Sequence, residues 1–170
     1  ALPVFFSNNV ASNYRVVRPE WSLPLLWLLA LGHLGLELDH RSAWLWLTDL
    51  PLAAFFAWHW FAWQPWKAMR PGLLAVLYLA FAWLPIAFSL FAAQSLIEFS
   101  SDDFVWGRIP LHVLTVGFFG SMLVAMVTRV TQGHAGRPLE MGLIPWVTFG
   151  ALQVVVLLRV WAELATDTWL

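Results

Sequence analysis

The stretch GLLAVLYLAFAWLPIAFSLFAAQSLI, residues 72–97, contains no charged residue and decides the fold class. A helix needs about 20 apolar residues to cross the hydrocarbon core of a bilayer, because it rises about 1.5 Å per residue. Residues 72–97 exceed that length. Pro85 lies inside the stretch, and membrane helices tolerate such a proline when neighbouring groups satisfy the freed carbonyl. The stretch therefore predicts a transmembrane helix.

The composition of the whole chain points the same way. Of 170 residues, 61% are hydrophobic and only 11% are charged, whereas soluble domains carry roughly 25% charged residues. Thirteen tryptophans fit a protein with two membrane interfaces, where this residue is enriched. A net charge of −1 without a basic stripe excludes a nucleic-acid partner, and the lack of cysteine excludes disulfides and thiolate metal sites within this chain. We predict an all-α, polytopic membrane helix bundle with the lipid bilayer as its surroundings.

Four further apolar stretches flank residues 72–97. They cover residues 22–38, 43–66, 109–128 and 142–162. We predict five spanning helices in a single domain, residues 1–170, and the odd number places the two termini on opposite sides of the membrane.

The basic residues indicate the orientation. Six of them flank one side of the five stretches and three flank the other: Arg15, Arg18, Lys67, Arg70, Arg129 and Arg137 against Arg41, Arg108 and Arg159. Because loops rich in Lys and Arg stay in the cytoplasm, the first side and the N-terminus are predicted to be cytoplasmic.

A layer of polar side chains is predicted near the outer face. Counted from the outer ends at helical rise, each span carries one such group about 4–9 Å deep: His33, Asp49, Gln94, His112 and Arg159. Ionisable residues inside a membrane are costly and usually functional. The layer is therefore the first candidate for a site.

His33 and His112 are the pair we predict to bind one metal or haem near the outer face. Glu37 lies four residues after His33 on the same helix face, where a carboxylate could orient the imidazole through its second nitrogen. Asp49, Gln94 and Glu37 form a candidate proton route. The structural alternative is a histidine hydrogen-bonded to Glu37 for packing alone. For His59, in the stretch AWHWFAW, we favour aromatic packing with its N–H bonded to a neighbouring carbonyl.

The stretch TRVTQGHAGRPL, residues 128–139, ends the fourth span. Gly133 and Gly136 are predicted to turn the chain around His134 in a cytoplasmic loop, and Pro138 prevents further helix. Arg129 and Arg137 supply positive charge beside His134, which suits a haem propionate or another anion. Taken alone, His134 is an ordinary loop histidine.

Residues 109–139, IPLHVLTVGFFGSMLVAMVTRVTQGHAGRPL, resemble the signature of the NnrS family, which joins L-H-x-L-T-x-G to a G-H-x-G-R-P-L-like turn. The opening LPVFFSNNV and the stretch RPGLLAVLYLAFAWLPIAF are similar to two weaker family patterns. The matched positions of the first motif are Leu111, His112, Leu114, Thr115, Gly117, Gly120, Met126, Arg129, Gly133, His134, Gly136, Arg137, Pro138 and Leu139.

The resemblance implies a bacterial inner-membrane protein that contains haem and copper and is linked to the response to nitric oxide. Histidines 33, 112 and 134 are then the candidate ligands. It also implies that this chain is the C-terminal part of a longer protein, whose N-terminal half, or other membrane subunits, would be partners. Two alternatives stay open at this point. The outer polar layer could serve a small-solute transporter or a membrane sensor without a redox cofactor, or it could stabilise a structural subunit. The sequence leaves open whether the protein catalyses a reaction.

Overall fold

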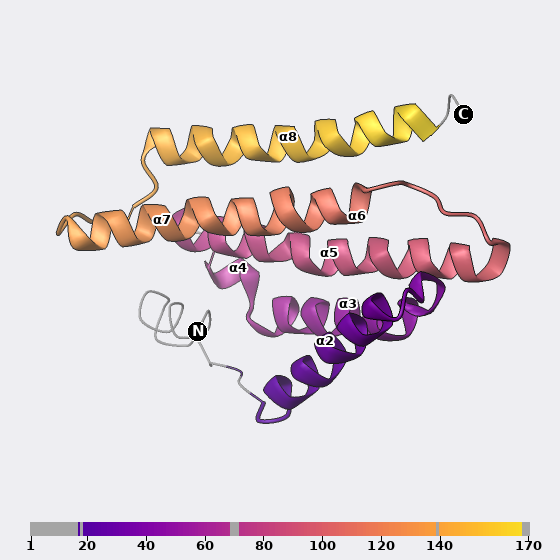
Figure 1. Cartoon of the computed structure of the whole chain (residues 1–170). Helices are drawn as coiled ribbons and strands as arrows, with labels where there is room; N and C mark the ends of the chain where they lie inside the picture. The colour runs from indigo at the N-terminus through magenta and orange to yellow at the C-terminus, as the bar shows by residue number, and fades with distance from the viewer. Residues whose placement is uncertain (1–16, 18, 69–71, 139, 168–170) are drawn as a thin grey trace.

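The computed structural model describes residues 17, 19–68, 72–138 and 140–167, and within these residues the chain is helical, without strands (Figure 1). The helices run side by side as an antiparallel bundle, as predicted. Arg15, Arg18, Arg70 and Leu139 lie outside the described residues, as does the opening stretch LPVFFSNNV, so the predictions that rest on them stay predictions.

Five long helices make the bundle, joined by short ones. In chain order the elements are α2 (Ser22–Leu38), η1 (Ser42–Trp44), α3 (Trp46–Ala62), α4 (Pro65–Ala68), α5 (Gly72–Ser101), α6 (Ile109–His112), η2 (Val113–Gly120), α7 (Ser121–His134) and α8 (Leu143–Asp167). The segment η1 is a 3₁₀ turn, and η2 is a π-helical segment that joins α6 and α7 into one continuous helix.

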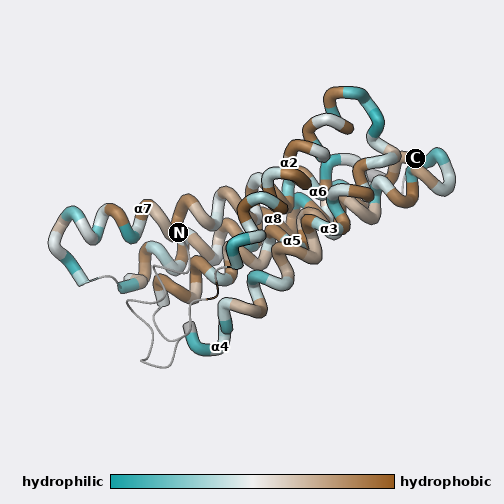
Figure 2. Tube along the Cα trace, turned by 90° about the horizontal axis from the view of Figure 1, so that it is seen from below, coloured by the Kyte–Doolittle hydropathy of each residue, from teal (hydrophilic) through white to brown (hydrophobic). Residues whose placement is uncertain are grey.

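Three of these helices are long and apolar enough to cross a membrane: α5, the α6–η2–α7 helix and α8. The helices α2 and α3 have 17 residues each, the lower limit for a crossing helix. Figure 2 shows hydrophobic residues along the lengths of the helices and hydrophilic residues gathered toward their ends. The chain is therefore a helical membrane bundle.

The ends of some helices differ from the ends of the predicted spans. Residues 22–38 coincide with α2, but α3 ends at Ala62 rather than at residue 66, because Trp63 and Gln64 leave the helix before α4. At the other extreme, α7 continues six residues beyond residue 128, to His134. The polar residues of VTRVTQGH prolong the helix past the apolar stretch, a continuation that an apolar-length criterion cannot detect.

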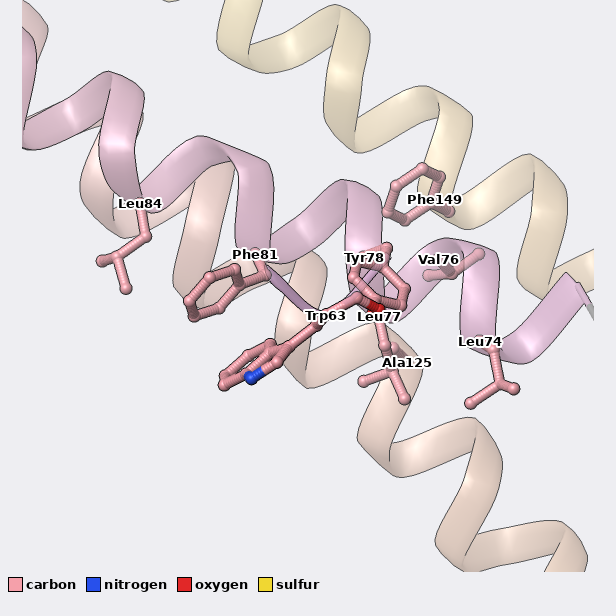
Figure 3. Close-up of a cluster of buried hydrophobic side chains, with 9 residues drawn as sticks. All are labelled: Trp63, Leu74, Val76, Leu77, Tyr78, Phe81, Leu84, Ala125 and Phe149. Carbon is pink, nitrogen blue, oxygen red and sulfur yellow. Dashed lines mark hydrogen bonds between the residues drawn. The ribbon is translucent and has the colours of Figure 1, made fainter. Parts of the chain in front are cut away.

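The helix α5 forms the centre of the bundle. Its N-terminal half supplies most of a buried cluster, which Trp63 of the α3–α4 link, Ala125 of α7 and Phe149 of α8 complete (Figure 3). Tyr78 anchors this cluster: its hydroxyl donates to the carbonyl of Trp63, and its own carbonyl accepts from the indole of Trp60 at 3.1 Å. In the most apolar stretch of each helix, 56% of α5 is buried within the protein, against 11% of α8. The α5 helix is therefore surrounded mostly by other helices, whereas α8 lies at the edge of the bundle.

Small residues set the distance between α5 and the α6–η2–α7 helix. A Cβ added at Gly117 would lie 3.1 Å from the ring of Trp83, and Ser121 and Ala125 on the same face are fully buried. The small-xxx-small spacing of these residues lets the two helices approach closely. On the α8 side, a Cβ at Gly120 would meet Leu152 at 3.0 Å.

Candidate functional site

A short polar contact between two ionisable side chains joins α2 to α3. His33 Nδ1 lies 2.6 Å from Asp49 Oδ1, and the Asp49 side chain is completely buried. Close helix packing makes this possible, because a Cβ on the adjacent Gly32 would lie 3.0 Å from the methyl group of Thr48. Since a carboxylate oxygen accepts, Nδ1 carries the proton, and in the neutral ring Nε2 is then an acceptor or a metal ligand.

The surroundings of this pair are aromatic on the α5 side. The rings of Phe88 and Phe91 meet the His33 ring edge-on at 6.2 and 6.3 Å between centroids. The second carboxylate oxygen, Asp49 Oδ2, is buried and has no hydrogen-bond partner among the described residues. An unpaired buried carboxylate oxygen is costly, so the His33 contact is the main compensation for burying this group.

Glu37 was expected to orient His33, but Asp49 holds that position instead. Glu37 lies at the rim of a cavity of about 200 Å³ at the end of the bundle that is predicted to be the outer one. Two other charged residues, Glu98 and Arg108, line the same cavity, and Glu98 Oε1 accepts from the Ser42 hydroxyl at 2.6 Å. The helix η1, which carries Ser42, is thereby tied to α5.

Gln94 also lines this outer cavity, with a structural role that its sequence position did not reveal. Its amide donates to the carbonyl of Val105 and, at 3.0 Å, to the carbonyl of Gly107. These bonds hold the link between α5 and α6 against the end of α5. The proton route through Asp49, Gln94 and Glu37 stays a prediction.

His112 meets a different acid. Its Nδ1 lies 3.6 Å from Glu163 Oε1 of α8, beyond hydrogen-bond length, and both side chains are partly exposed, at 21% and 27%. Glu163 also comes close to Gly107, since a Cβ added there would lie 2.8 Å from Glu163 Oε2. His112 Nδ1 has no hydrogen-bond partner in the described part of the chain.

The structure does not bring His33 and His112 to one contact. His33 lies between α2 and α3 and touches α5, whereas His112 faces α8, on the other side of α5 in the bundle (Figure 1). Nor do the described residues contain a group of three or more His, Asp or Glu side chains that could hold a metal ion. Shared ligation by this pair stays a prediction that the geometry does not favour.

His134 was placed in a loop, but it is the last residue of α7 and is exposed. Gly133 is helical, so the turn falls at Gly136, which has φ +63°. Gln132 closes this turn, because its side-chain amide donates to the carbonyl of Glu140 at 2.6 Å and accepts from the backbone N–H of Glu140 at 3.0 Å. Arg129 and Arg137 flank His134 in sequence, one half-buried and the other exposed.

A comparison with protein-family models matches residues 2–170 to the NnrS protein family. The chain belongs to the NnrS family. Comparison with curated proteins and with solved structures gives no significant match. NnrS is a membrane family associated with the nitric oxide response, so the resemblance drawn from residues 109–139 is confirmed and extends over almost the whole chain.

Within this NnrS-family chain, sequence reasoning missed the residues that connect α8 to the bundle. Trp83 Nε1 donates to Gln153 Oε1 at 2.6 Å, and Gln153 Nε2 donates to the buried Ser121 hydroxyl at 2.8 Å, which joins α5, α8 and α7. A glutamine in the middle of an apolar span is the signal that could have revealed Gln153. Glu163 lay beyond the predicted end of the fifth span and gave no such signal.

The prediction for His59 of this NnrS-family chain is confirmed. Its Nδ1 lies 2.8 Å from the carbonyl of Phe55, and the buried ring packs among Trp21, Phe55, Trp58 and Trp63. The hydroxyl of Ser22, at the start of α2, lies 2.9 Å from Nε2.

Proposed function

We propose that this chain is a bacterial inner-membrane protein of the nitric oxide response that binds haem, with His33 as a residue that would hold it. One observation carries the proposal: a fully buried carboxylate holds His33 Nδ1 at 2.6 Å. Metal-ligating histidines characteristically donate their second ring N–H to a carboxylate, which fixes the tautomer and the ring orientation. Asp49 supplies that partner from another helix, and Nε2 is left for a metal.

The donor set fits haem better than copper. A haem iron needs only one or two protein ligands, and a single oriented histidine suffices. The apolar rings of Phe88 and Phe91 beside His33 suit the porphyrin face. Haem iron, when bound, would supply a position for nitric oxide. Asp49 would orient the His33 imidazole, and Phe88 and Phe91 would exclude water from it.

Copper binding rests on the family resemblance, and His112 and His134 are the candidate ligands. Neither has a second histidine or a carboxylate pair beside it among the described residues, so a copper site requires ligands from elsewhere. Arg129 and Arg137 flank His134 in sequence at the end of α7, away from His33, and an anion other than the propionates of a haem held by His33 is their proposed partner.

The test is an absorption spectrum with metal analysis on protein purified from membranes. We expect a Soret band that His33→Ala removes or shifts, while His40→Asn, a change in an exposed loop histidine with φ +55°, leaves it intact. An unchanged band in His33→Ala rejects the assignment of His33. His134→Ala with haem retained and copper lost would separate two sites, whereas no change in either metal would make His134 structural.

A small-solute transporter is the second candidate, and the outer cavity of about 200 Å³ favours it, because Glu37, Glu98 and Arg108 line that space. Under this function the purified protein is colourless and free of metal, and vesicles that contain it accumulate solute. Glu98→Gln would then reduce uptake, and a Soret band in the wild-type protein would contradict this alternative.

A further inference from the structure

The outer cavity lies where α2, η1, α5 and α6 meet. Its volume is about 200 Å³, more than the roughly 150 Å³ that accommodates a benzene molecule in a protein interior. Polar side chains form one part of its wall, and which of their atoms are already hydrogen-bonded decides what the cavity can bind. Apolar side chains form the other part: Leu45, Phe91, Phe104, Pro110 and Leu111.

Gln94 turns an acceptor atom away from its own hydrogen bonds. Its Nε2 donates to the carbonyl of Val105 and, at 3.0 Å, to that of Gly107, so its Oε1 points to the other side. The side chain lines the cavity and is only 7% exposed, and its Oε1 accepts no hydrogen bond from the described residues. A buried amide oxygen without a donor is costly, so this atom is an acceptor available to a ligand.

Two carboxylates add negative charge to the same space. Glu98 lies four residues after Gln94 on one face of α5, and its Oε1 accepts from the Ser42 hydroxyl at 2.6 Å, which leaves Oε2 available. Glu37 reaches the cavity from α2. The hydroxyl of Ser95 is already used, because it donates to the carbonyl of Ser42 at 2.8 Å. The available atoms of these groups are therefore acceptors, and two of the three groups are negatively charged.

Arg108 also lines the cavity, but it does not neutralise these acids by direct contact. Its side chain is exposed, and it forms no ion pair with Glu37 or Glu98 in the part of the chain that the structure describes. The described residues also lack a group of three His, Asp or Glu side chains that could hold a metal ion here. An amide oxygen and two carboxylates beside aromatic and aliphatic walls match a positively charged donor group on a small apolar body.

We propose that the outer cavity binds a small organic ammonium ion, whose N–H groups donate to Gln94, Glu98 and Glu37 while its apolar part packs against Phe91 and Leu111. A primary ammonium carries three donors and no acceptor, which matches the three acceptor groups. A carboxylate ligand would meet like charges, and a purely apolar ligand would leave the acceptors without donors. The site goes beyond haem binding. For the transport function, on which this part of the inference rests, it names the class of solute.

The test is isothermal titration calorimetry on the full chain in nanodiscs of zwitterionic lipid, with the heats of empty nanodiscs subtracted. The probes share one ring and differ in charge: benzylammonium, benzyl alcohol and benzoate. We expect saturable binding of benzylammonium at one per chain, about tenfold tighter than benzyl alcohol, because hydrogen bonds between charged groups are the stronger ones. Benzoate should not bind saturably. Benzyl alcohol or benzoate binding as tightly as benzylammonium would overturn the proposal.

Charge variants test the acceptors. Glu98→Gln keeps an acceptor for Ser42 and removes the charge, so it should weaken benzylammonium binding about fivefold. Glu37→Gln should weaken it less, because Glu37 is exposed. The matched control is Glu20→Gln, a change in an exposed acid before the other end of α2, which should leave binding unchanged. Unchanged binding in both Glu98→Gln and Glu37→Gln would contradict the proposal.

Arg108→Gln tests the sign of the ligand's charge. The variant removes a positive charge from the cavity, so benzylammonium should bind about twofold more tightly. Weaker binding would mean that Arg108 contacts an anionic or acceptor group of the ligand, and the proposal would then be wrong.

The space itself is tested by size. Leu111→Trp places a larger ring in the cavity and should abolish saturable binding, whereas Phe119→Trp, at an exposed position farther along the same long helix, should not. Saturable binding that survives Leu111→Trp would place the ligand elsewhere.

Failure of this site is distinguishable from failure of the proposed functions. A Soret band without benzylammonium binding rejects the cation site alone. Benzylammonium binding without its accumulation in vesicles keeps the site and rejects transport.

Discussion

Two histidine–carboxylate pairs lie on opposite sides of α5, and they differ in every respect that matters for chemistry. His33 and Asp49 are 2.6 Å apart with the acid completely buried, whereas His112 and Glu163 are 3.6 Å apart with both side chains partly exposed. Gly32 explains the short distance in the His33–Asp49 pair, because the lack of a side chain at Gly32 lets α2 approach α3 closely. In the second pair, the acid comes from α8, which is little buried. Close packing of the two helices buries the acid of the first pair, and only there does the acid hold the imidazole at hydrogen-bond distance.

The largest expected effect comes from removing His33. His33→Ala leaves the buried Asp49 carboxylate without its partner, and loss of one member of a buried pair costs about 3–5 kcal/mol in unfolding free energy. The measurement is reversible unfolding in detergent micelles. The double variant His33→Leu with Asp49→Leu should recover most of this loss, and if it is no more stable than His33→Ala, burial of the acid is not the cause.

Gly32→Val should loosen the His33–Asp49 pair, so that it becomes more like the His112–Glu163 pair. Its side chain needs space that Thr48 occupies, so α2 must move away from α3 at a cost of about 1–3 kcal/mol in unfolding free energy. Thermal unfolding reports the cost. Gly35→Ala, where an added Cβ meets no atom within 4 Å, is the matched control and should not lower stability, because alanine favours the helix more than glycine does.

Gln153→Leu tests what holds α8, and therefore Glu163, in place. The substitution leaves the Trp83 indole N–H without its acceptor and the Ser121 hydroxyl without its donor, which should cost about 1–2 kcal/mol. Hydrogen exchange of α8 amides should accelerate more than that of α5. Equal acceleration in both helices would mean that the polar link stabilises the whole bundle rather than α8.

Glu163→Gln should have the smallest effect of these variants. A partly exposed pair at 3.6 Å contributes below about 1 kcal/mol, because solvent screens both groups. Chemical denaturation of this variant can be compared with Asp39→Asn, which breaks the exposed ion pair with Arg41. A loss comparable to that of His33→Ala would show that His112 is fixed as firmly as His33.

The sequence predicted the fold well and the site partly, for physical reasons that particular residues show. The apolar length that a bilayer demands located the long helices, and the range predicted at residues 22–38 coincides with α2. The polar layer placed His33 and Asp49 at one depth, and they do meet. The assignment of Glu37 as the partner failed because spacing along one helix says nothing about which neighbouring helix comes closer.

Contacts of α8 were beyond prediction from the sequence. Glu163 approaches His112 through the rotation of two helices about their own axes, and no local pattern encodes that rotation. The turn at Gly136 was expected, whereas the clamp by Gln132 was not, because it depends on where Glu140 lies after the turn.

The π-helical segment Val113–Gly120 affects which sides of the α6–η2–α7 helix face α5 and α8. A π turn accommodates an additional residue. The residues that precede it are therefore rotated about the helix axis by about 100°, compared with their positions in an uninterrupted α-helix. His112 precedes the segment, while Ser121 and Ala125, which pack toward the core, follow it. Deleting one residue of the segment would straighten the helix and swing the imidazole of His112 off the α8 side, with the inner packing left where it is. The direction in which that imidazole points thus depends on the backbone of the π-helical segment as well as on the side chains around it.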